Sequence, residues 1–331
     1  MTKSTELLVS ELSRIVDASK YLILTGGIAV GKTFIAEAIT EKCREAQFDS
    51  QGALPNGKTV YEIEKVIVPI HPSYSYEDFV EGTAVSTSGH SLSIRSEDKV
   101  FLDLLQRANQ SWAHKDNRKY FLILDGIERG DLSGILGELL PLLELHGSSS
   151  FTKRMKNNTT IRMTPNLYII ATYCDAIDSS GTYTYGLFRH FYHRRIESDY
   201  SYMADNASPI FSNYDITANA MYYRTNRLII ENLHNRSQSM FQEKDKYAIG
   251  HGLFIPNAVS AYMRLQIIPL LLLYVKDGVL DKTACVGIDD VPPFCFFTYY
   301  RSDDVPNQLV SEYMKARKLY QLDDEDSETE E

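Results

Sequence analysis

A glycine-rich turn between an apolar run and a helical segment constrains the fold of this chain more than any other feature. The turn spans Gly26–Thr33 and fits the pattern Gly-x-x-x-x-Gly-Lys-Ser/Thr. The run Tyr21–Thr25 before it reads as a short buried strand, and the residues after it, through about Arg44, read as a helix. Backbone N–H groups of a turn in this place can surround phosphate oxygens at a helix N-terminus. The pattern therefore predicts an α/β fold with a phosphate-binding turn.

The same turn predicts the residues that hold a nucleotide and its metal. Its eight members, all expected to contact the ligand, are Gly26, Gly27, Ile28, Ala29, Val30, Gly31, Lys32 and Thr33. Lys32 is expected to reach the β and γ phosphates, and the Thr33 hydroxyl to ligate Mg²⁺. A second apolar run, Tyr120–Leu124, ends at Asp125, and such strand ends line the ligand crevice of α/β sheets. Asp125 is therefore predicted as a Mg²⁺ partner, direct or through water, and the base, GTP or ATP, stays open.

Apolar runs alternate with helical segments as far as about Tyr200. Strands are also expected at Val66–Ile70 and Asn166–Thr172, helices at Thr5–Ala18, Ser96–Ala113 and Leu132–Leu145, and a hairpin within Ser148–Thr164. Buried strands that alternate with helices indicate a parallel sheet covered on both faces. Beyond Tyr200 the pattern becomes mainly helical, which favours a smaller helical lid.

This pattern divides the chain into five segments. They are an N-terminal helix at 1–19, an α/β nucleotide-binding domain at 20–200, a helical lid at 201–282, a C-terminal extension at 283–322 and an acidic tail at 323–331. The carboxylates of the tail repel one another, so we expect a solubilising end, and a partner-binding role is the alternative.

The composition narrows the classes of function. The formal net charge of −10 weighs against this chain gripping nucleic acid by itself, because phosphate binding needs a concentrated basic surface. The longest apolar stretch, Leu265–Val275, contains Pro269 and falls short of the roughly 20 residues of a membrane helix. The four cysteines are scattered without metal-ligand spacing, which suits a reducing compartment. We therefore expect a cytoplasmic protein with no membrane segment and only indirect contact with DNA.

Three further segments are similar to motifs of the AAA+ GTPase subunits in McrB-type modified-DNA restriction systems. In chain order they are His71–Gly82, Asp125–Glu144, and Ile249–Phe254 followed by Ile267–Leu271. The resemblance runs from about Lys20 to Tyr274, and the family's large N-terminal DNA-reading domain has no counterpart in it. It implies an AAA+ fold, a homo- or hetero-oligomeric ring, a McrC-like or nuclease partner, and a role in DNA restriction or anti-phage defence.

The resemblance breaks at the residues that orient the attacking water. The family's second strand ends in Asp-Glu-Ile-Asn-Arg, whereas this chain has Asp125-Gly126-Ile127-Glu128-Arg129. Gly126 stands in the place of the family's water-orienting Glu. Glu128 lies two positions further on and can face the same way only if the chain stays extended. Glu128 is thus a candidate catalytic substitute, and the alternative is an acid at a helix start, where the helix dipole favours it.

The sensor strand and the arginine motif of the family are also altered. Cys174 occupies the place of an Asn that polarises the water, and cysteine is a weak hydrogen-bond partner. Of the family's arginine run, Arg189 remains, with Arg194 and Arg195 close behind it. Each is a candidate arginine finger toward a neighbouring subunit, and the alternative for each is an exposed basic residue on a helix end.

Two functions are open at this point. In the first, the chain is a McrB-like NTPase subunit whose hydrolysis is weak or depends on a partner. In the second, it is a catalytically inactive scaffold that binds nucleotide without turnover. Losing one water-orienting group typically costs a rate factor of about 10² or more, so Gly126 and Cys174 together favour the second function.

Overall fold

The computed structural model describes two compact units of the chain. The described residues are 3–44, 60–88, 91–143, 153–155, 160–176, 189–197, 244–253 and 268–280, with residues 222, 225, 226, 229, 230, 233, 285, 286, 294 and 295. The first unit holds Lys3–Gly26 and Lys32–Ile196, and the second holds Gly27–Gly31 and the chain from Glu197 onward. Most of the predicted lid and extension, and all of the predicted acidic tail, lie outside the described residues.

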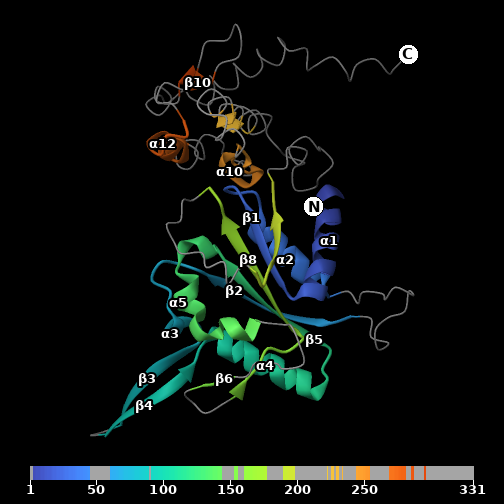
Figure 1. Ribbon diagram of the computed structural model, residues 1–331, viewed down its shortest axis with the longest axis vertical. Helices are drawn as coiled ribbons and strands as arrows, with labels where there is room; N and C mark the ends of the chain where they lie inside the picture. The colour runs from blue at the N-terminus through green and yellow to red at the C-terminus, as the bar shows by residue number, and fades with distance from the viewer. Residues whose placement is uncertain are drawn as a thin grey trace. The chain divides into compact units, whose positions relative to one another are not determined.

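A sheet of five parallel strands forms the first unit (Figure 1). Its strand order is β2-β5-β8-β1-β9. The strands are β1 (Tyr21–Gly26), β2 (Glu62–Pro69), β5 (Arg118–Asp125), β8 (Leu167–Cys174) and β9 (Tyr192–Arg195). Every neighbouring pair is parallel, so each connection crosses over rather than turning back. The sheet confirms the α/β prediction, and it places β8 between the strand before the glycine-rich turn and the strand that ends at Asp125.

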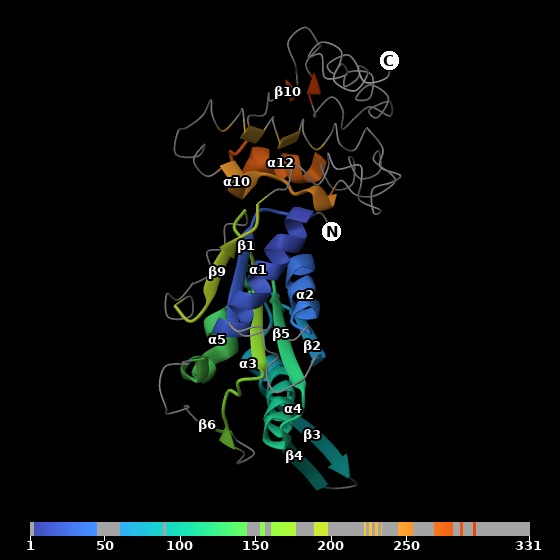
Figure 2. The same ribbon diagram turned by 90° about the vertical axis from the view of Figure 1, so that its right-hand side faces the viewer.

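Alternate residues of the central strands are buried on opposite faces of the sheet. On one face, Ile23, Leu122 and Ile169 join a core cluster with α4 (Val100–His114) and α5 (Leu132–Leu136). On the other face, the residues next to these in sequence are also buried. There, α1 (Lys3–Ser19) and α2 (Lys32–Lys42) pack against each other and against β1, as Figure 2 shows. Burial on both faces explains why the central strands read as continuous apolar runs.

An antiparallel hairpin precedes α4, at a place where the sequence predicted no strand. After the short helix α3 (Tyr76–Phe79), β3 (Glu81–Ser88) pairs with β4 (Ser91–Asp98) as a hairpin that extends away from the sheet (Figure 1). The predicted helix at Ser96–Ala113 therefore starts late, at Val100. Polar residues dominate both strands of the hairpin, so the sequence carries no buried-strand signal there.

Two shorter predictions have mixed outcomes. The hairpin expected within Ser148–Thr164 is confirmed, since β6 (Lys153–Arg154) pairs antiparallel with β7 (Thr160–Ile161). The helix expected at Leu132–Leu145 breaks at Gly137, where φ is +49°, and continues as a 3₁₀ helix to Leu143. Gly137 is thus the residue that ends α5.

The described parts of the second unit are short. They include α10 (Lys244–Tyr247), a 3₁₀ turn at His251–Leu253, α12 (Ile268–Lys276), and the pair β10 (Cys285–Val286) and β11 (Phe294–Cys295). Within the described ranges of the whole chain, no helix has the length and apolar character needed to cross a membrane.

A charged cluster ties α1 to the amino ends of the strands. The Asp17 carboxylate accepts hydrogen bonds from Lys119 Nζ at 2.7 Å and from the Tyr168 hydroxyl at 2.9 Å. Burial alone would raise the pKa of Asp17, but the hydrogen bonds and the charge of Lys119 outweigh it and lower that pKa. The cluster lies at the opposite end of the strands from Asp125 and Cys174, so it anchors the helix rather than the candidate site.

Candidate nucleotide-binding site

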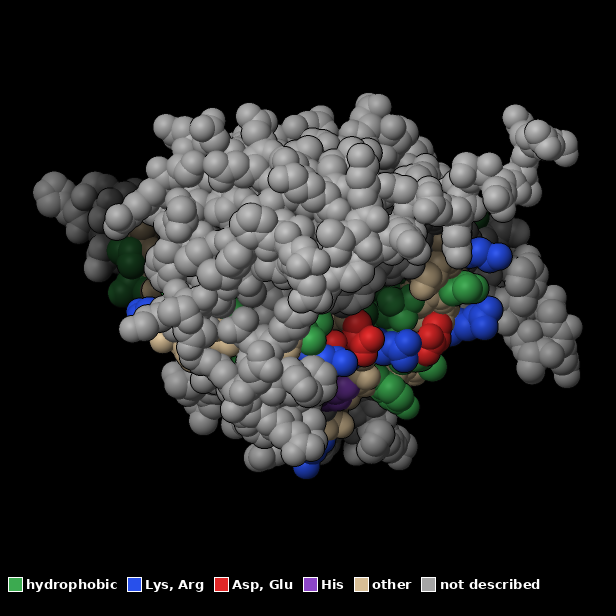
Figure 3. Space-filling model, turned by 90° about the horizontal axis from the view of Figure 1, so that it is seen from above, with side chains coloured by type: hydrophobic (Ala, Val, Ile, Leu, Met, Phe, Trp, Pro, Cys, Tyr) green, Lys and Arg blue, Asp and Glu red, His purple; other side chains and the backbone are tan. Residues whose placement is uncertain are grey.

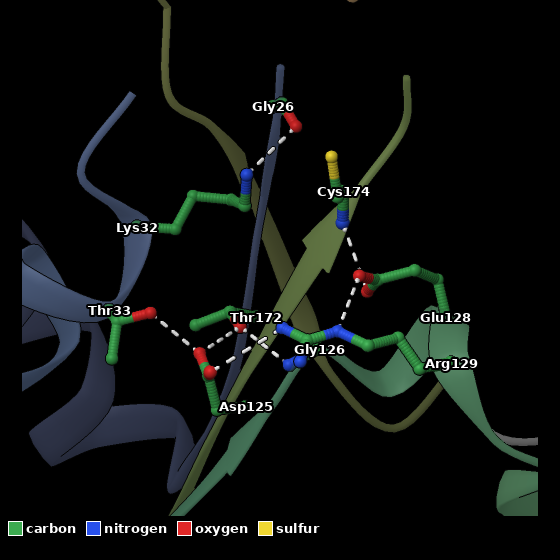
Figure 4. A network of polar contacts seen from close by, with 9 residues as sticks. All are labelled: Gly26, Lys32, Thr33, Asp125, Gly126, Glu128, Arg129, Thr172 and Cys174. Carbon is green, nitrogen blue, oxygen red and sulfur yellow. Dashed lines mark hydrogen bonds and ion pairs between the residues drawn. The ribbon is translucent and has the colours of Figure 1, made fainter. Parts of the chain in front are cut away.

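Asp125 and Thr33 meet at the carboxyl end of the sheet, although they lie far apart in sequence. The Thr33 hydroxyl, in the first turn of α2, donates to Asp125 Oδ1 at 2.6 Å. Thr172 on the intervening strand β8 donates to the same oxygen at 2.8 Å, and its own oxygen accepts from the Gly126 N–H at 2.9 Å (Figure 4). Thr172 is buried and orients the Asp125 carboxylate. Its role was missed in the sequence, where only its place on the strand next to Asp125 signals it.

Lys32 is held close to the same strand ends. Its ammonium donates to the Gly26 carbonyl at 3.0 Å (Figure 4). Burial lowers the pKa of Lys32, and Cys174 and the carboxylates of Glu128, Asp175 and Asp125 oppose that shift. The lysine is therefore a partly buried cation whose positive charge the surrounding acidic groups stabilise.

Gly126 leaves the extended conformation immediately after β5. Its φ is +73°, a left-handed value that favours glycine, and the 3₁₀ turn Ile127–Arg129 follows. A Cβ added at Gly126 would collide with Nε, Cζ and Nη2 of Arg129. That guanidinium lies 3.6 Å from Asp125 Oδ2. The space beside residue 126 is thus filled by Arg129, whose position the sequence did not reveal.

The Glu128 side chain reaches the end of β8 from a 3₁₀ turn and not from an extended strand. The chain does not stay extended through residue 126, so the condition set for Glu128 is not met. Its side chain is nevertheless only 1% exposed. Its Oε2 accepts from the Cys174 N–H at 3.1 Å, and its Oε1 lies 3.5 Å from Arg129 Nε (Figure 4). The 3₁₀ turn therefore places a buried carboxylate beside Cys174 at the end of β8.

Cys174 contributes its backbone rather than its sulfur to this contact. The thiol is buried, and burial raises its pKa, an effect that Lys32 opposes. The neutral thiol is a weak partner, as expected from the sequence. The next residue, Asp175, bonds through its N–H to the Gly26 carbonyl at 3.3 Å. The end of β8 thus connects Glu128 to the strand that leads into the glycine-rich turn.

The three candidate arginines lie in two settings, and neither is a helix end. Arg189 is exposed in a turn, and its Nε donates to His190 Nε2 at 3.2 Å. Arg194 and Arg195 belong to the edge strand β9, which corrects the alternative of a helix end. Arg195 forms an ion pair with Asp175 at 2.6 Å, and Arg194 lies 3.6 Å from Glu11.

The glycine-rich turn itself, Gly27–Gly31, is held within the second unit. The Ile28 carbonyl accepts from the Gly250 N–H at 2.7 Å, and the Ala29 carbonyl accepts from the Gly252 N–H at 3.1 Å. Ala29 and Gly31 have left-handed φ values of +58° and +88°. Among the residues that the structure describes, no heavy atom lies within 4 Å of a Cβ added at Gly31.

The donors present fit Mg²⁺. A hydroxyl oxygen and a carboxylate oxygen 2.6 Å apart are hard ligands, and Mg²⁺ in phosphate sites takes one or two carboxylates and keeps several waters. In the part of the chain that the structure describes, no three His, Cys, Asp or Glu side chains are grouped to hold a metal. Thr33 and Asp125 therefore suit an ion that also takes ligands from water and phosphate.

A known protein is similar to this chain in sequence. No family model matches the chain. The chain is 27% identical over 248 residues to the type IV methyl-directed restriction enzyme EcoKMcrB subunit of Escherichia coli strain K12. That match covers 71% of this chain and 47% of the relative, so the chain spans about half of the relative's length. A solved structure of a predicted ATPase from Cytophaga hutchinsonii has a TM-score of 0.37 and 12% identity, covering 78% of this chain and 74% of that one. Together, the sequence match, the parallel sheet and the glycine-rich turn identify the chain as a McrB-like AAA+ protein with the α/β P-loop fold.

Proposed function

We propose that the chain binds a nucleoside triphosphate with Mg²⁺ and hydrolyses it weakly or with the help of a partner. The observation that carries this proposal is the contact between Thr33 and Asp125, two residues 92 positions apart whose oxygens lie 2.6 Å from each other. A hydroxyl at the start of the helix after the turn, a lysine next to it in sequence and an acid at the end of another strand of the sheet are the parts that phosphoryl-transfer sites share.

Each of these residues has a role that follows from its contacts. Lys32, a partly buried cation, neutralises charge on the β and γ phosphates. Thr33 and Asp125 hold the metal, and Thr172 keeps the Asp125 carboxylate in one orientation. Bound Mg²⁺ would supply further neutralisation of the phosphate oxygens. GTP and ATP both suit these groups, since none of them contacts a base.

Glu128 is the residue we propose to orient the attacking water. Its carboxylate is buried and lies at the end of β8, where the family's sensor residue stands. Glu128 also lies in the first turn of the 3₁₀ helix Ile127–Arg129, so the alternative of an acid at a helix start stays open. The proposed mechanism needs the carboxylate to accept a proton or a hydrogen bond from water while the Cys174 N–H holds it in place.

The inactive scaffold remains the second candidate function, and one observation favours it. Glu128 already accepts from the Cys174 N–H and lies beside Arg129, so its two oxygens both have partners. A carboxylate engaged in this way is less available to water. The chain would then bind nucleotide and organise an assembly without turnover.

The assembly is proposed from the relative. Because that relative is a restriction enzyme subunit, we propose a ring, homo- or hetero-oligomeric, that works with a McrC-like or nuclease partner in DNA restriction or anti-phage defence in the cytoplasm. Arg189 would reach the nucleotide of a neighbouring subunit. Contact with DNA would be indirect, because the formal net charge is −10. Among the described side chains in Figure 3, Lys and Arg lie next to Asp and Glu.

Nucleotide binding and turnover by the purified chain test the proposal. ATP and GTP are compared with Mg²⁺ for the wild type, Lys32→Ala and Glu128→Gln. Glutamine keeps an oxygen for the Cys174 N–H, so this variant removes the charge and little else. We expect Lys32→Ala to lose binding, and Glu128→Gln to keep binding while turnover falls by about 10².

Other outcomes of this experiment decide between the two functions. Binding without turnover in the wild type supports the scaffold. Turnover that Glu128→Gln leaves unchanged removes Glu128 from the mechanism. A wild type that binds neither nucleotide overturns both candidate functions.

A further inference from the structure

A short glycine-containing segment of the second unit is hydrogen-bonded to the backbone of the glycine-rich turn. The N–H groups of Gly250 and Gly252 donate to the carbonyls of Ile28 and Ala29 at 2.7 and 3.1 Å. Glycine is required for this approach. A Cβ at Gly250 would collide with the backbone of Ala29 and Val30, and a Cβ at Gly252 would stand 2.8 Å from the Ala29 carbonyl oxygen. The contact is therefore backbone against backbone.

Peptide geometry gives this contact a consequence for the turn. In a trans peptide, the carbonyl of one residue and the N–H of the next point in opposite directions, and the described chain contains no cis peptide bond. Tying the carbonyls of Ile28 and Ala29 to the glycine segment therefore directs the N–H groups of Ala29 and Val30 away from it. N–H groups are the parts of such a turn that bind phosphate.

One buried side chain holds the glycine segment in place. Asn226 is 1% exposed and bonds both polar groups of the Ile249 backbone. Its Oδ1 accepts from the Ile249 N–H at 2.8 Å, and its Nδ2 donates to the Ile249 carbonyl at 2.9 Å. The same Nδ2 donates to the Tyr222 carbonyl at 3.2 Å. Ile249 directly precedes Gly250, so the amide fixes the peptide from which the bond to Ile28 is made.

We infer that Asn226 is a positioning residue for phosphate binding, acting through Ile249 and Gly250 on the peptides of the turn. The inference rests on the proposed nucleotide function and adds its regulation: the affinity for the phosphate groups is set from residues more than 190 positions away in sequence. Any partner or nucleotide-dependent change that moves Asn226 rotates the N–H groups of the turn and releases phosphate. The base and ribose, which the turn does not hold, are unaffected.

The test compares the affinity of the chain for a nucleoside triphosphate and for the matching monophosphate, with Mg²⁺. Wild type, Asn226→Leu and Thr225→Val are titrated by calorimetry well below their unfolding temperatures. Thr225 is the matched control, because it is buried in the adjacent position and makes no bond to Ile249 in the described contacts. We expect Asn226→Leu to weaken binding of the triphosphate by about tenfold and binding of the monophosphate far less. The dissociation constant of the monophosphate divided by that of the triphosphate should therefore fall. Thr225→Val should keep the wild-type ratio.

A second measurement separates this inference from the proposed function. Hydrogen exchange at the amides of Gly250 and Gly252 reports the contact without nucleotide, and we expect it to accelerate in Asn226→Leu. Gly252→Ala, which leaves Asn226 intact, should also lower the affinity ratio. A folded Asn226→Leu with the wild-type ratio and wild-type exchange overturns the inference while the nucleotide function stands. A wild type that binds no nucleotide overturns the proposed function and, with it, this role for Asn226.

Discussion

The guanidinium of Arg129 fills the space into which a side chain at Gly126 would have to extend. The left-handed φ of Gly126 adds a second obstacle, because a residue with a Cβ is strained there by about 1 to 2 kcal/mol. A glutamate at this position would therefore have to displace the Arg129 guanidinium and adopt a left-handed backbone.

Gly126→Glu should lower the free energy of unfolding by about 2 kcal/mol and should not raise turnover. Combining it with Arg129→Ala removes the collision but keeps the strained φ, so the double variant should recover part of the loss. Urea unfolding and NTPase assays measure the two effects. Gly126→Ala in the Arg129→Ala background is the control for strain alone, because the alanine Cβ would itself meet Arg129. A gain in turnover by Gly126→Glu with Arg129 present would show that the collision is relieved by other means.

Thr172→Val removes a hydroxyl while keeping the shape of the side chain. The Asp125 carboxylate then loses a donor, and the buried Gly126 N–H loses its acceptor, which costs about 1 to 2 kcal/mol of stability. We also expect the Mg²⁺ concentration needed for nucleotide binding to rise several-fold, measured by Mg²⁺ titration at fixed nucleotide. Thr164→Val, a buried threonine that makes no bond to Asp125 among the described contacts, should leave the Mg²⁺ requirement unchanged. An unaltered requirement in Thr172→Val would mean that Asp125 is oriented without Thr172.

Asp17→Asn should destabilise the chain by about 2 kcal/mol at neutral pH, because Lys119 loses its buried counter-charge. The pKa of Asp17 is lowered in the folded state, so its contribution is complete above the unfolded value near 3.9 and is lost as the pH falls through the folded pKa. The difference between wild type and variant should therefore be constant near pH 6 and shrink below about pH 4. Chemical denaturation across this range measures it, and a difference independent of pH would refute the charge-based account.

Arg189→Ala should leave nucleotide binding intact and reduce turnover, if Arg189 acts on a neighbouring subunit's nucleotide. Mixing Arg189→Ala with Lys32→Ala chains should then restore part of the turnover, because some interfaces combine an intact turn with an intact arginine. Arg195→Ala is the comparison, since its guanidinium is already paired with Asp175 within one chain. Mixtures no more active than the sum of their components would place Arg189 outside the catalytic interface.

The sheet could be predicted because its central strands are buried on both faces. Tyr120–Leu124 is apolar at every position and lies wholly within β5, as the sequence indicates. The hairpin of β3 and β4 gives no such signal, since Val85 and Ile94 are exposed and its other residues are mostly polar. β3 and β4 are close in sequence, and their pairing depends on register rather than on burial. A pattern of apolar residues does not reveal pairing of this kind.

The sequence predicts the site residues whose place follows from the order of strand, turn and helix. It does not predict the residues whose role depends on which side chain or backbone group they bond. Lys32, Thr33 and Asp125 follow from a strand, a turn and a helix start. Thr172 and Asn226 do not, because a buried polar residue looks the same in sequence whether it orients a carboxylate or a loop. Glu128 is buried because the chain makes a left-handed turn at Gly126. A prediction that assumes an extended strand through residue 126 does not include that turn.

The crossover connections of the parallel sheet have a consequence for how the protein is made. No two neighbouring strands are joined by a tight turn, so every contact in the sheet waits for a distant stretch of chain. Gly26–Thr33 leaves the ribosome long before Thr172 and Gly250 are synthesised. The phosphate-binding turn therefore stays without its supporting contacts until Gly250 has been synthesised, and only then can the nascent chain adopt its ligand-ready conformation.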